Sequence, residues 1–268
     1  MTEFVTSKDG TRIGYDRLGQ GPPLVIVNGA LSVRTFVFAR KMAEGLATRF
    51  TVFNFDRRGR GDSTDDPQYS VAKEVDDVAA MCKAARGKPF VVGFSSGAAL
   101  ALEAAAAGVP MAGLYAYEPP YTRADPNDKT EADFRERLEQ YRANGQRDEA
   151  VSYFMRTVGV PGFGIAIMKL LPMWKVMRSV AHTLPYDAAV MDRFTVPTQR
   201  FAAIKVPTIV AFGAKTSPAL KLGAQAAADA VPQAQRRVVP RSNHGVKPKA
   251  MVPELAAVFL SPSSPGLD

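Results

Sequence analysis

The stretch FVVGFSSGAAL, residues 90–100, joins an apolar run to a Gly-x-Ser-x-Gly turn and then to an alanine-rich segment. Apolar residues before such a turn favour a buried strand, and the alanines after it favour a helix. A serine at this junction can stand on a strained turn with its hydroxyl exposed, while the flanking glycines admit neighbouring backbone. Ser95 is therefore a candidate nucleophile. The alternative is that the glycines only ease a strand-to-helix connection.

Strands and helices alternate on both sides of this stretch. Further strands are expected at 24–27, 51–55, 112–117, 208–212 and 235–239, with helices at 33–48, 71–85, 97–107, 219–231 and 251–260. Residues 3–7 and 12–17 flank a turn signal and are expected to form a hairpin at an antiparallel edge. The pattern predicts an α/β fold with a mostly parallel eight-stranded sheet and helices on both faces.

The alternation stops between Pro119 and Phe201, where only helices are expected, at 131–143, 147–158, 165–181 and 186–193. We therefore expect two parts: residues 1–118 and 202–268 form the α/β core, and residues 119–201 form a helical cap over the strand ends. The cap is rich in methionine and aromatic residues, which usually serve as core. The candidates for a substrate pocket are Asn28, Phe94, Phe154, Met173 and Trp174.

The two histidines take different positions in this predicted fold. His244 follows the strand expected at 235–239 and precedes the last helix, so it lies in a loop at the carboxyl edge of the sheet. Ser95 lies at the same edge, where open α/β sheets bind their ligands. Because a serine hydroxyl needs a general base at neutral pH, we expect His244 to serve Ser95. His182 falls inside the cap and is expected to be structural or solvent-facing.

Two more turns follow predicted strands. LVIVNGA, residues 24–30, ends in a glycine turn, and the backbone N–H of Ala30 is expected to pair with that of Ser96 as an oxyanion hole. DRRGRGDS, residues 56–63, is a tight polar turn. We interpret it as a loop held by bonds between arginine and aspartate.

Taken in chain order, these motifs resemble those of the α/β-hydrolase superfamily. The resemblance covers nearly the whole chain: the strand before the NGA turn, a D-x-R-G-x-G-x-S turn, the serine elbow, the helical cap and a late histidine. It implies the α/β-hydrolase fold and a catalytic set made of Ser95 as nucleophile, His244 as base, and the N–H groups of Ala30 and Ser96 as oxyanion hole.

The chain departs from the superfamily pattern at three places. Asn28 stands where relatives usually have a loop-supporting histidine, and Phe94 stands before the nucleophile, where histidine is frequent. The third departure concerns the catalytic acid, which usually follows the second-last strand. The stretch FGAKTSP, residues 212–218, contains no carboxylate there.

Some α/β hydrolases carry their acid after the strand that follows the elbow helix, and the resemblance then points to Glu118. Glu118 could instead tether the start of the cap. A third reading is a serine–histidine dyad helped by Thr216 or Ser217. Without a carboxylate partner, an imidazole has a less well fixed tautomer and loses stabilisation of its charged form.

The function that this set predicts is hydrolysis of a small or medium apolar ester, thioester or lactone through an acyl-enzyme. Two alternatives stay open because a fold does not fix chemistry. One is a lyase or cyclase acting on C–C or C–O bonds, which the missing late carboxylate favours. The other is a non-catalytic protein that binds small ligands on a hydrolase scaffold.

Composition restricts the partners. The 268 residues are 46% hydrophobic and 22% charged, as in ordinary soluble proteins, and the net charge is +8. The basic residues are scattered and carry no recognition motif, so we expect no nucleic-acid partner. No apolar run is long enough for a membrane helix, the first ten residues are too polar for a signal peptide, and Cys82 is alone. We expect a cytoplasmic protein with a small-molecule substrate, no membrane partner, no metal and no cofactor. The sequence does not fix the oligomeric state.

Overall fold

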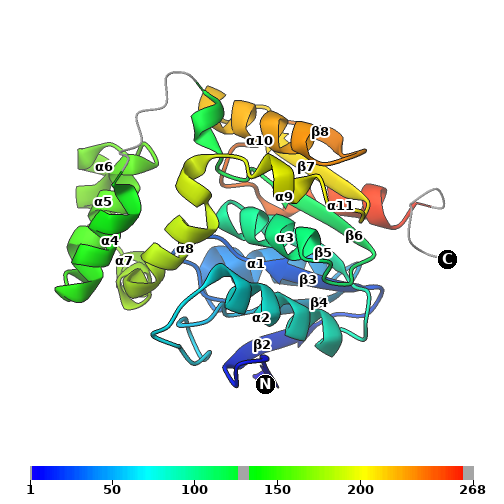
Figure 1. The fold of residues 1–268 in the computed structure, drawn as a ribbon, viewed down its shortest axis with the longest axis horizontal. Helices are drawn as coiled ribbons and strands as arrows, with labels where there is room; N and C mark the ends of the chain where they lie inside the picture. Colours follow the sequence, from blue (N-terminus) through cyan, green and yellow to red (C-terminus); the bar gives the residue numbers. More distant parts are fainter. Residues whose placement is uncertain (1, 126–132, 262–268) are drawn as a thin grey trace.

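The computed structural model describes residues 2–125 and 133–261. The strands form one eight-stranded sheet in the order β1-β2-β4-β3-β5-β6-β7-β8 (Figure 1). β1 and β2 pair antiparallel, β2 also pairs antiparallel with β4, and the pairs from β4 to β8 are parallel. The predicted sheet and its N-terminal hairpin are confirmed. The strands are β1 (Glu3–Thr6), β2 (Arg12–Leu18), β3 (Pro23–Val27), β4 (Thr51–Phe55), β5 (Phe90–Phe94), β6 (Gly113–Tyr117), β7 (Thr208–Gly213) and β8 (Gln235–Val239).

Helices cover both faces of the sheet, as predicted. α1 (Val37–Leu46) and α11 (Pro248–Phe259) pack against each other and share one apolar layer with β3 and β4. α2 (Val71–Ala84), α3 (Ser96–Ala106) and α10 (Pro218–Ala230) share the layer on the opposite face. The central strands are therefore buried on both sides, which explains why their sequences are continuous apolar runs.

The described residues between β6 and β7 contain helices and no strand. α4 to α7 gather at one end of the molecule, and α8 lies between them and the sheet (Figure 1). Their apolar side chains form a separate core that also includes Leu31 and Val33. The elements are η1 (Thr122–Ala124), α4 (Phe134–Ala143), α5 (Arg147–Thr157), α6 (Gly162–Lys169), α7 (Pro172–Ser179), η2 (Ala181–Thr183), α8 (Leu184–Val190), η3 (Asp192–Phe194) and α9 (Thr198–Phe201).

Three predicted helices differ from the observed ones. The helix expected at 186–193 runs from Leu184 to Val190, and its last predicted residues belong to η3, where Arg193 has a φ of 57°. The prediction of one helix at 165–181 is wrong. The structure has two helices there, α6 ending at Lys169 and α7 beginning at Pro172, and Leu171 between them is extended. Proline lacks an N–H and disfavours helical backbone at the preceding residue, so α7 begins there. The helix expected at 33–48 begins only at Val37, because the residues before it form a loop with Leu31 at a φ of 57°. The start of the helix expected at 131–143 lies outside the described residues.

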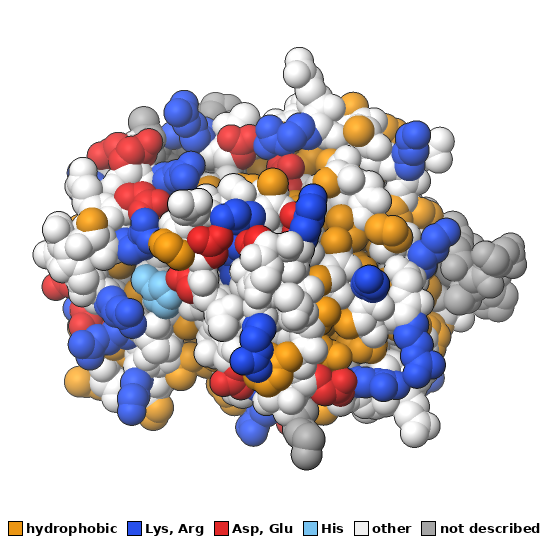
Figure 2. Space-filling view, turned by 60° about the horizontal axis from the view of Figure 1, so that its bottom comes forward, with side chains coloured by type: hydrophobic (Ala, Val, Ile, Leu, Met, Phe, Trp, Pro, Cys, Tyr) orange, Lys and Arg blue, Asp and Glu red, His pale blue; other side chains and the backbone are white. Residues whose placement is uncertain are grey.

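The positive charge is spread over the surface. On the face drawn in Figure 2, Lys and Arg side chains lie among acidic and apolar ones. Arg57, Arg58 and Arg60, which form one of the basic clusters of the sequence, are almost completely buried and contribute no surface charge. In the described part of the chain, no helix has both the length and the apolar character that crossing a membrane requires.

Cys82 on α2 is expected to be unreactive while the protein is folded. Its side chain is 1% exposed, and burial raises the pKa of the thiol to about 12. The thiolate is the reactive form, so neither access nor ionisation favours attack at pH 8. We expect an aromatic disulfide reagent to modify one thiol per chain in guanidinium chloride and none in buffer. Rapid modification of the native protein would contradict this burial.

Candidate active site

Ser95 stands on a strained turn between β5 and α3. Its backbone has φ 54° and ψ −126°, a conformation that costs a residue with a side chain about 1–3 kcal/mol. The Ser95 N–H donates to the carbonyl oxygen of Tyr117 at 2.9 Å, which ties the turn to the end of β6. The side chain is partly exposed and does not cap the helix that follows. Among the residues that the structure describes, the hydroxyl has no hydrogen-bond partner, and it lies at the carboxyl edge of the sheet.

The glycines around Ser95 permit close backbone approach. A Cβ at Gly97 would clash with the carbonyl oxygens of Val27 and Asn28, at the end of β3. A Cβ at Gly29 would lie 2.9 Å from the carbonyl oxygen of Phe94 and 3.2 Å from the Cβ of Ser95. The turn after β3 therefore lies directly against the serine turn.

Two backbone donors flank this contact. Within the described residues, the N–H groups of Ala30 and Ser96 donate to no acceptor. The first belongs to the turn after β3, and the second opens α3, where the helix dipole favours negative charge. Free N–H groups that converge beside a serine can stabilise an oxyanion.

Glu118 and His244 form a direct hydrogen bond. The Nδ1 atom of His244 lies 2.6 Å from Oε2 of Glu118. An ionised carboxylate only accepts hydrogen bonds, so Nδ1 carries the proton and Nε2 is the basic nitrogen. Glu118 is fully buried, whereas the His244 side chain is 49% exposed. The imidazole is thus held from the protein side and accessible from the solvent side.

The second carboxylate oxygen of Glu118 is also occupied. Oε1 accepts the backbone N–H of Gly213 at 2.8 Å and the hydroxyl of Thr216. Burial raises the pKa of Glu118, but the hydrogen bonds from His244, Thr216 and Gly213 more than offset it, so the pKa lies below its ordinary value. Glu118 is therefore ionised at neutral pH. It follows β6, and the last residue of β7 and the loop after it supply two donors in place of a carboxylate.

The five residues predicted to line a substrate pocket differ in where they lie and what they contact. The Asn28 amide donates to Oδ1 of Asn54 at 2.8 Å, so this side chain supports the turn. Phe94 is partly exposed and lies beside Tyr117. Phe154 and Trp174 are buried in the separate core formed by the helices between β6 and β7, where the Trp174 indole donates to Asp148. Met173 is partly buried against the same core.

A model of the Alpha/beta hydrolase family matches residues 24–255. The chain belongs to this family. Solved structures agree with the assignment. An alpha/beta hydrolase from Sphaerobacter thermophilus is 46% identical, with a TM-score of 0.88, and the alignment covers 97% of this chain and 100% of that one. The predicted α/β-hydrolase fold is confirmed.

Two more distant structures share the fold of this alpha/beta hydrolase. An esterase from a Rhodococcus species is 21% identical with a TM-score of 0.66, over 96% of this chain and 97% of that one. A thermophilic esterase from Thermogutta terrifontis is 22% identical with a TM-score of 0.65, over 95% of this chain and 94% of that one. At these identities the likeness concerns the fold alone.

A group of buried charges beside the elbow of this alpha/beta hydrolase was not predicted from the sequence. We call Arg57, Arg60, Glu74 and Asp187 the buried arginine cluster; each is at most 1% exposed. Arg57 binds both oxygens of Glu74, at 2.6 and 2.9 Å, and Oδ1 of Asp187 at 2.6 Å. Arg60 binds Oδ2 of Asp187 at 2.6 Å. The arginine-rich turn was the available signal, but its partners lie on α2 and α8.

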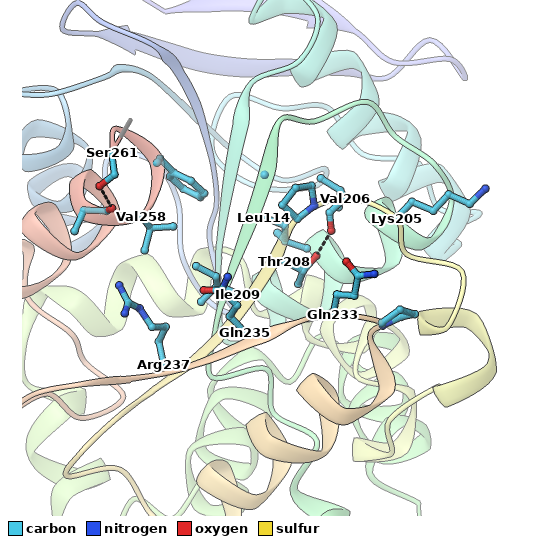
Figure 3. Close-up of a pocket in the computed structure, with 15 residues that line it drawn as sticks. Leu114, Lys205, Val206, Thr208, Ile209, Gln233, Gln235, Arg237, Val258 and Ser261 are labelled. Atoms are coloured by element: carbon cyan, nitrogen blue, oxygen red, sulfur yellow. Dashed lines mark hydrogen bonds between the residues drawn. The ribbon is translucent and has the colours of Figure 1, made fainter. Parts of the chain in front are cut away.

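A pocket of about 390 Å³ lies at the amino ends of the parallel strands, opposite the carboxyl edge that carries Ser95. Its lining includes Leu114, Thr208 and Gln235, which lie at the starts of β6, β7 and β8 (Figure 3). Ser95 and Glu118 follow the carboxyl ends of β5 and β6, and these strands are parallel to β7 and β8. This pocket is therefore separate from the candidate active site.

Proposed function

We propose that the protein is a serine hydrolase that cleaves a small or medium apolar ester, thioester or lactone. The observation that carries the proposal is the hydrogen bond of 2.6 Å between Glu118 and Nδ1 of His244. It supports a base with a fixed tautomer at the same sheet edge as Ser95. The strained serine turn and the two free N–H groups beside it add further support.

The proposed reaction has two halves. Nε2 of His244 takes the proton of the Ser95 hydroxyl as Oγ attacks the acyl carbon, and the N–H groups of Ala30 and Ser96 stabilise the oxyanion. The imidazolium then protonates the departing alkoxide or thiolate, which leaves an acyl-enzyme. In the second half His244 deprotonates a water, the hydroxide attacks the acyl carbon, and Ser95 recovers its proton as the carboxylic acid departs. Glu118 stabilises the imidazolium in both halves.

The apolar substrate class follows from the surroundings of this site. Phe94 precedes the serine, and the apolar core of the cap continues into Leu31 and Val33 on the turn that carries Ala30. In this proposal residues 119–201 act as the cap domain on a core of 1–118 and 202–268. The esterases among the similar structures are in keeping with ester cleavage.

The alternative of a lyase or cyclase depended on the missing carboxylate after β7. Glu118 occupies a position where it can serve His244, so that argument no longer favours the alternative. A non-catalytic ligand-binding protein would have no need for a carboxylate buried against a half-exposed histidine. Hydrolysis is therefore the reading that these contacts support best.

Labelling with a fluorophosphonate tests the proposal. The reagent phosphonylates a serine only when a base activates the hydroxyl, so we expect one adduct per chain on the peptide that contains Ser95. Intact mass and peptide mapping measure it, and Ser95→Ala should remain unlabelled. A folded wild-type protein that acquires no adduct and hydrolyses none of a panel of short and medium acyl esters would contradict the proposal.

A further inference from the structure

The buried arginine cluster connects the cap to both residues whose N–H groups flank Ser95. Asp187 lies on α8, is completely buried, and uses both carboxylate oxygens. Oδ1 accepts the Ser96 hydroxyl at 2.8 Å as well as a donor from Arg57. Oδ2 accepts from Arg60. A single carboxylate from the cap thus holds the first residue of α3 and two arginines of the turn after β4.

Arg60 carries the connection onward to the turn after β3. Its Nη1 atom donates to the carbonyl oxygen of Gly29 at 2.8 Å, and its Nε donates to the Thr183 hydroxyl at 3.0 Å. In a trans peptide, the carbonyl of one residue and the N–H of the next point in opposite directions in one plane. Holding the Gly29 carbonyl therefore fixes the direction of the Ala30 N–H.

The charges of the cluster make this arrangement rigid. Two arginines face two carboxylates in a region closed to water, so each ion is held by a counterion. Burial raises the pKa of Asp187, but the charges of Arg60 and Arg57 lower it by more. The carboxyl pKa therefore lies below its ordinary value, and the group stays charged. Charge-assisted hydrogen bonds of this kind are short and directional.

We propose that Asp187 is a positioning residue that aligns the oxyanion hole, through Ser96 directly and through Arg60 and the Gly29 carbonyl for Ala30. The inference rests on the proposed acyl transfer at Ser95. It makes the cap part of the catalytic geometry, because the two N–H donors converge only when α8 is docked. Asp187 itself touches no reacting atom.

The test compares Asp187→Asn with wild type and with Asp77→Asn. Asp77 is a matched control because it is also fully buried and paired with an arginine, Arg58, but contacts neither turn beside Ser95. We expect Asp187→Asn to lower kcat for a p-nitrophenyl ester by about 100-fold with KM unchanged, the loss typical of a reacting geometry misplaced by 1 Å. Asp77→Asn should lower the thermal unfolding temperature and leave kcat unchanged.

Two inhibitors separate positioning from general destabilisation. An alkyl trifluoromethyl ketone forms a tetrahedral oxyanion adduct with the serine, whereas the methyl ketone of the same chain stays planar. Affinity for the first should fall in Asp187→Asn in parallel with kcat, and affinity for the second should not change. Equal losses for both ketones, or a kcat no lower than that of Asp77→Asn, would overturn the inference.

Two more conservative variants test the connection through Ser96 and the connection through Arg60 separately. Both keep the four charges of the buried arginine cluster, so the result does not depend on the folding of Asp187→Asn. Ser96→Ala removes one hydroxyl and should lower kcat about tenfold. Arg60→Lys replaces three guanidinium nitrogens, which bond Thr183, the Gly29 carbonyl and Asp187, with one ammonium that cannot reproduce this geometry, and should also lower kcat and trifluoromethyl ketone affinity. If kcat and trifluoromethyl ketone affinity are unchanged in both variants, neither connection aligns the oxyanion hole.

The trifluoromethyl ketone experiment also shows whether the proposed function itself is wrong. A fluorine resonance of a hemiketal on the wild-type enzyme confirms that Ser95 attacks carbonyl carbon. If wild type forms no such adduct and shows no esterase activity, the proposed acyl transfer is wrong and the inference falls with it. If wild type forms the adduct and Asp187→Asn forms it equally well, only the positioning role is wrong.

Discussion

Alanine at Ser95 is expected to lower kcat for an activated ester by a factor on the order of 10⁵, and alanine at His244 by a similar factor. The first substitution removes the oxygen that forms the acyl bond, and the second removes the nitrogen that takes its proton. Because the two residues act as one unit, the double variant should be no slower than either single one. Steady-state hydrolysis at saturating substrate measures all three.

Two matched substitutions control for general effects on the fold. Ser179→Ala removes an exposed hydroxyl on α7 that bonds only the carbonyl of Val176. His182→Ala removes the other imidazole, which lies 3.8 Å from Asp65 in the loop between β4 and α2. Both should leave kcat unchanged. Losses that multiply in the Ser95 and His244 double variant would mean that the two side chains act independently, contrary to the proposed mechanism.

Replacing Glu118 with glutamine is expected to lower kcat by about 10⁴-fold, because the amide imposes the wrong histidine tautomer. The donors from Gly213 and Thr216 both point at Oε1, so the amide oxygen takes that position. The amide nitrogen then faces Nδ1 of His244 and requires it to accept a hydrogen bond. The imidazole proton moves to Nε2, which can no longer serve as the base.

The Glu118→Gln variant should also change how the stability of the fold depends on pH. The folded pKa of Glu118 is below its ordinary value, so ionised Glu118 stabilises the fold. This contribution is complete above the ordinary glutamate pKa and is lost as pH falls through the lower folded value. The difference in unfolding temperature between wild type and Glu118→Gln should therefore be largest near neutral pH and shrink in acid.

Glu254→Gln provides the matched control for that variant. Glu254 lies on α11, where it binds Tyr115 and Arg237 away from the carboxyl edge of the sheet. Its replacement should leave kcat unchanged. A Glu118→Gln enzyme with kcat close to that of wild type would indicate that the imidazole finds its tautomer without this carboxylate.

The sequence predicted the features that depend on neighbours in the chain. Continuous apolar runs gave the buried strands, and the glycine spacing gave the turn at Ser95. Glu118 was a candidate through the resemblance to α/β hydrolases that carry their acid after the strand following the elbow helix, and the structure brings it to His244. The break before Pro172 was also readable from the sequence, because proline disfavours helical backbone at the residue before it.

The buried arginine cluster could not be predicted in this way. Arg57 and Asp187 are separated by 130 residues, and neither spacing nor periodicity connects them. The sequence indicated a loop held by bonds between arginine and aspartate, but charged residues of polar turns usually face solvent, so it did not indicate that Arg57 and Arg60 are buried. Their partners became apparent only when the docking of α8 placed a carboxylate between them.

The open edge of the sheet at β8 has a consequence for how copies of the chain meet. β8 pairs with β7 alone among the described strands, and its first four residues are exposed. An unpaired edge is a template on which another chain can add a strand. Arg236 and Arg237 are adjacent in β8, so their side chains lie on opposite faces of the sheet, where Arg236 pairs with Asp229 and Arg237 with Glu254. A second strand added to this edge would have to accommodate these charged pairs, so we expect β8 to resist pairing with another copy of the chain.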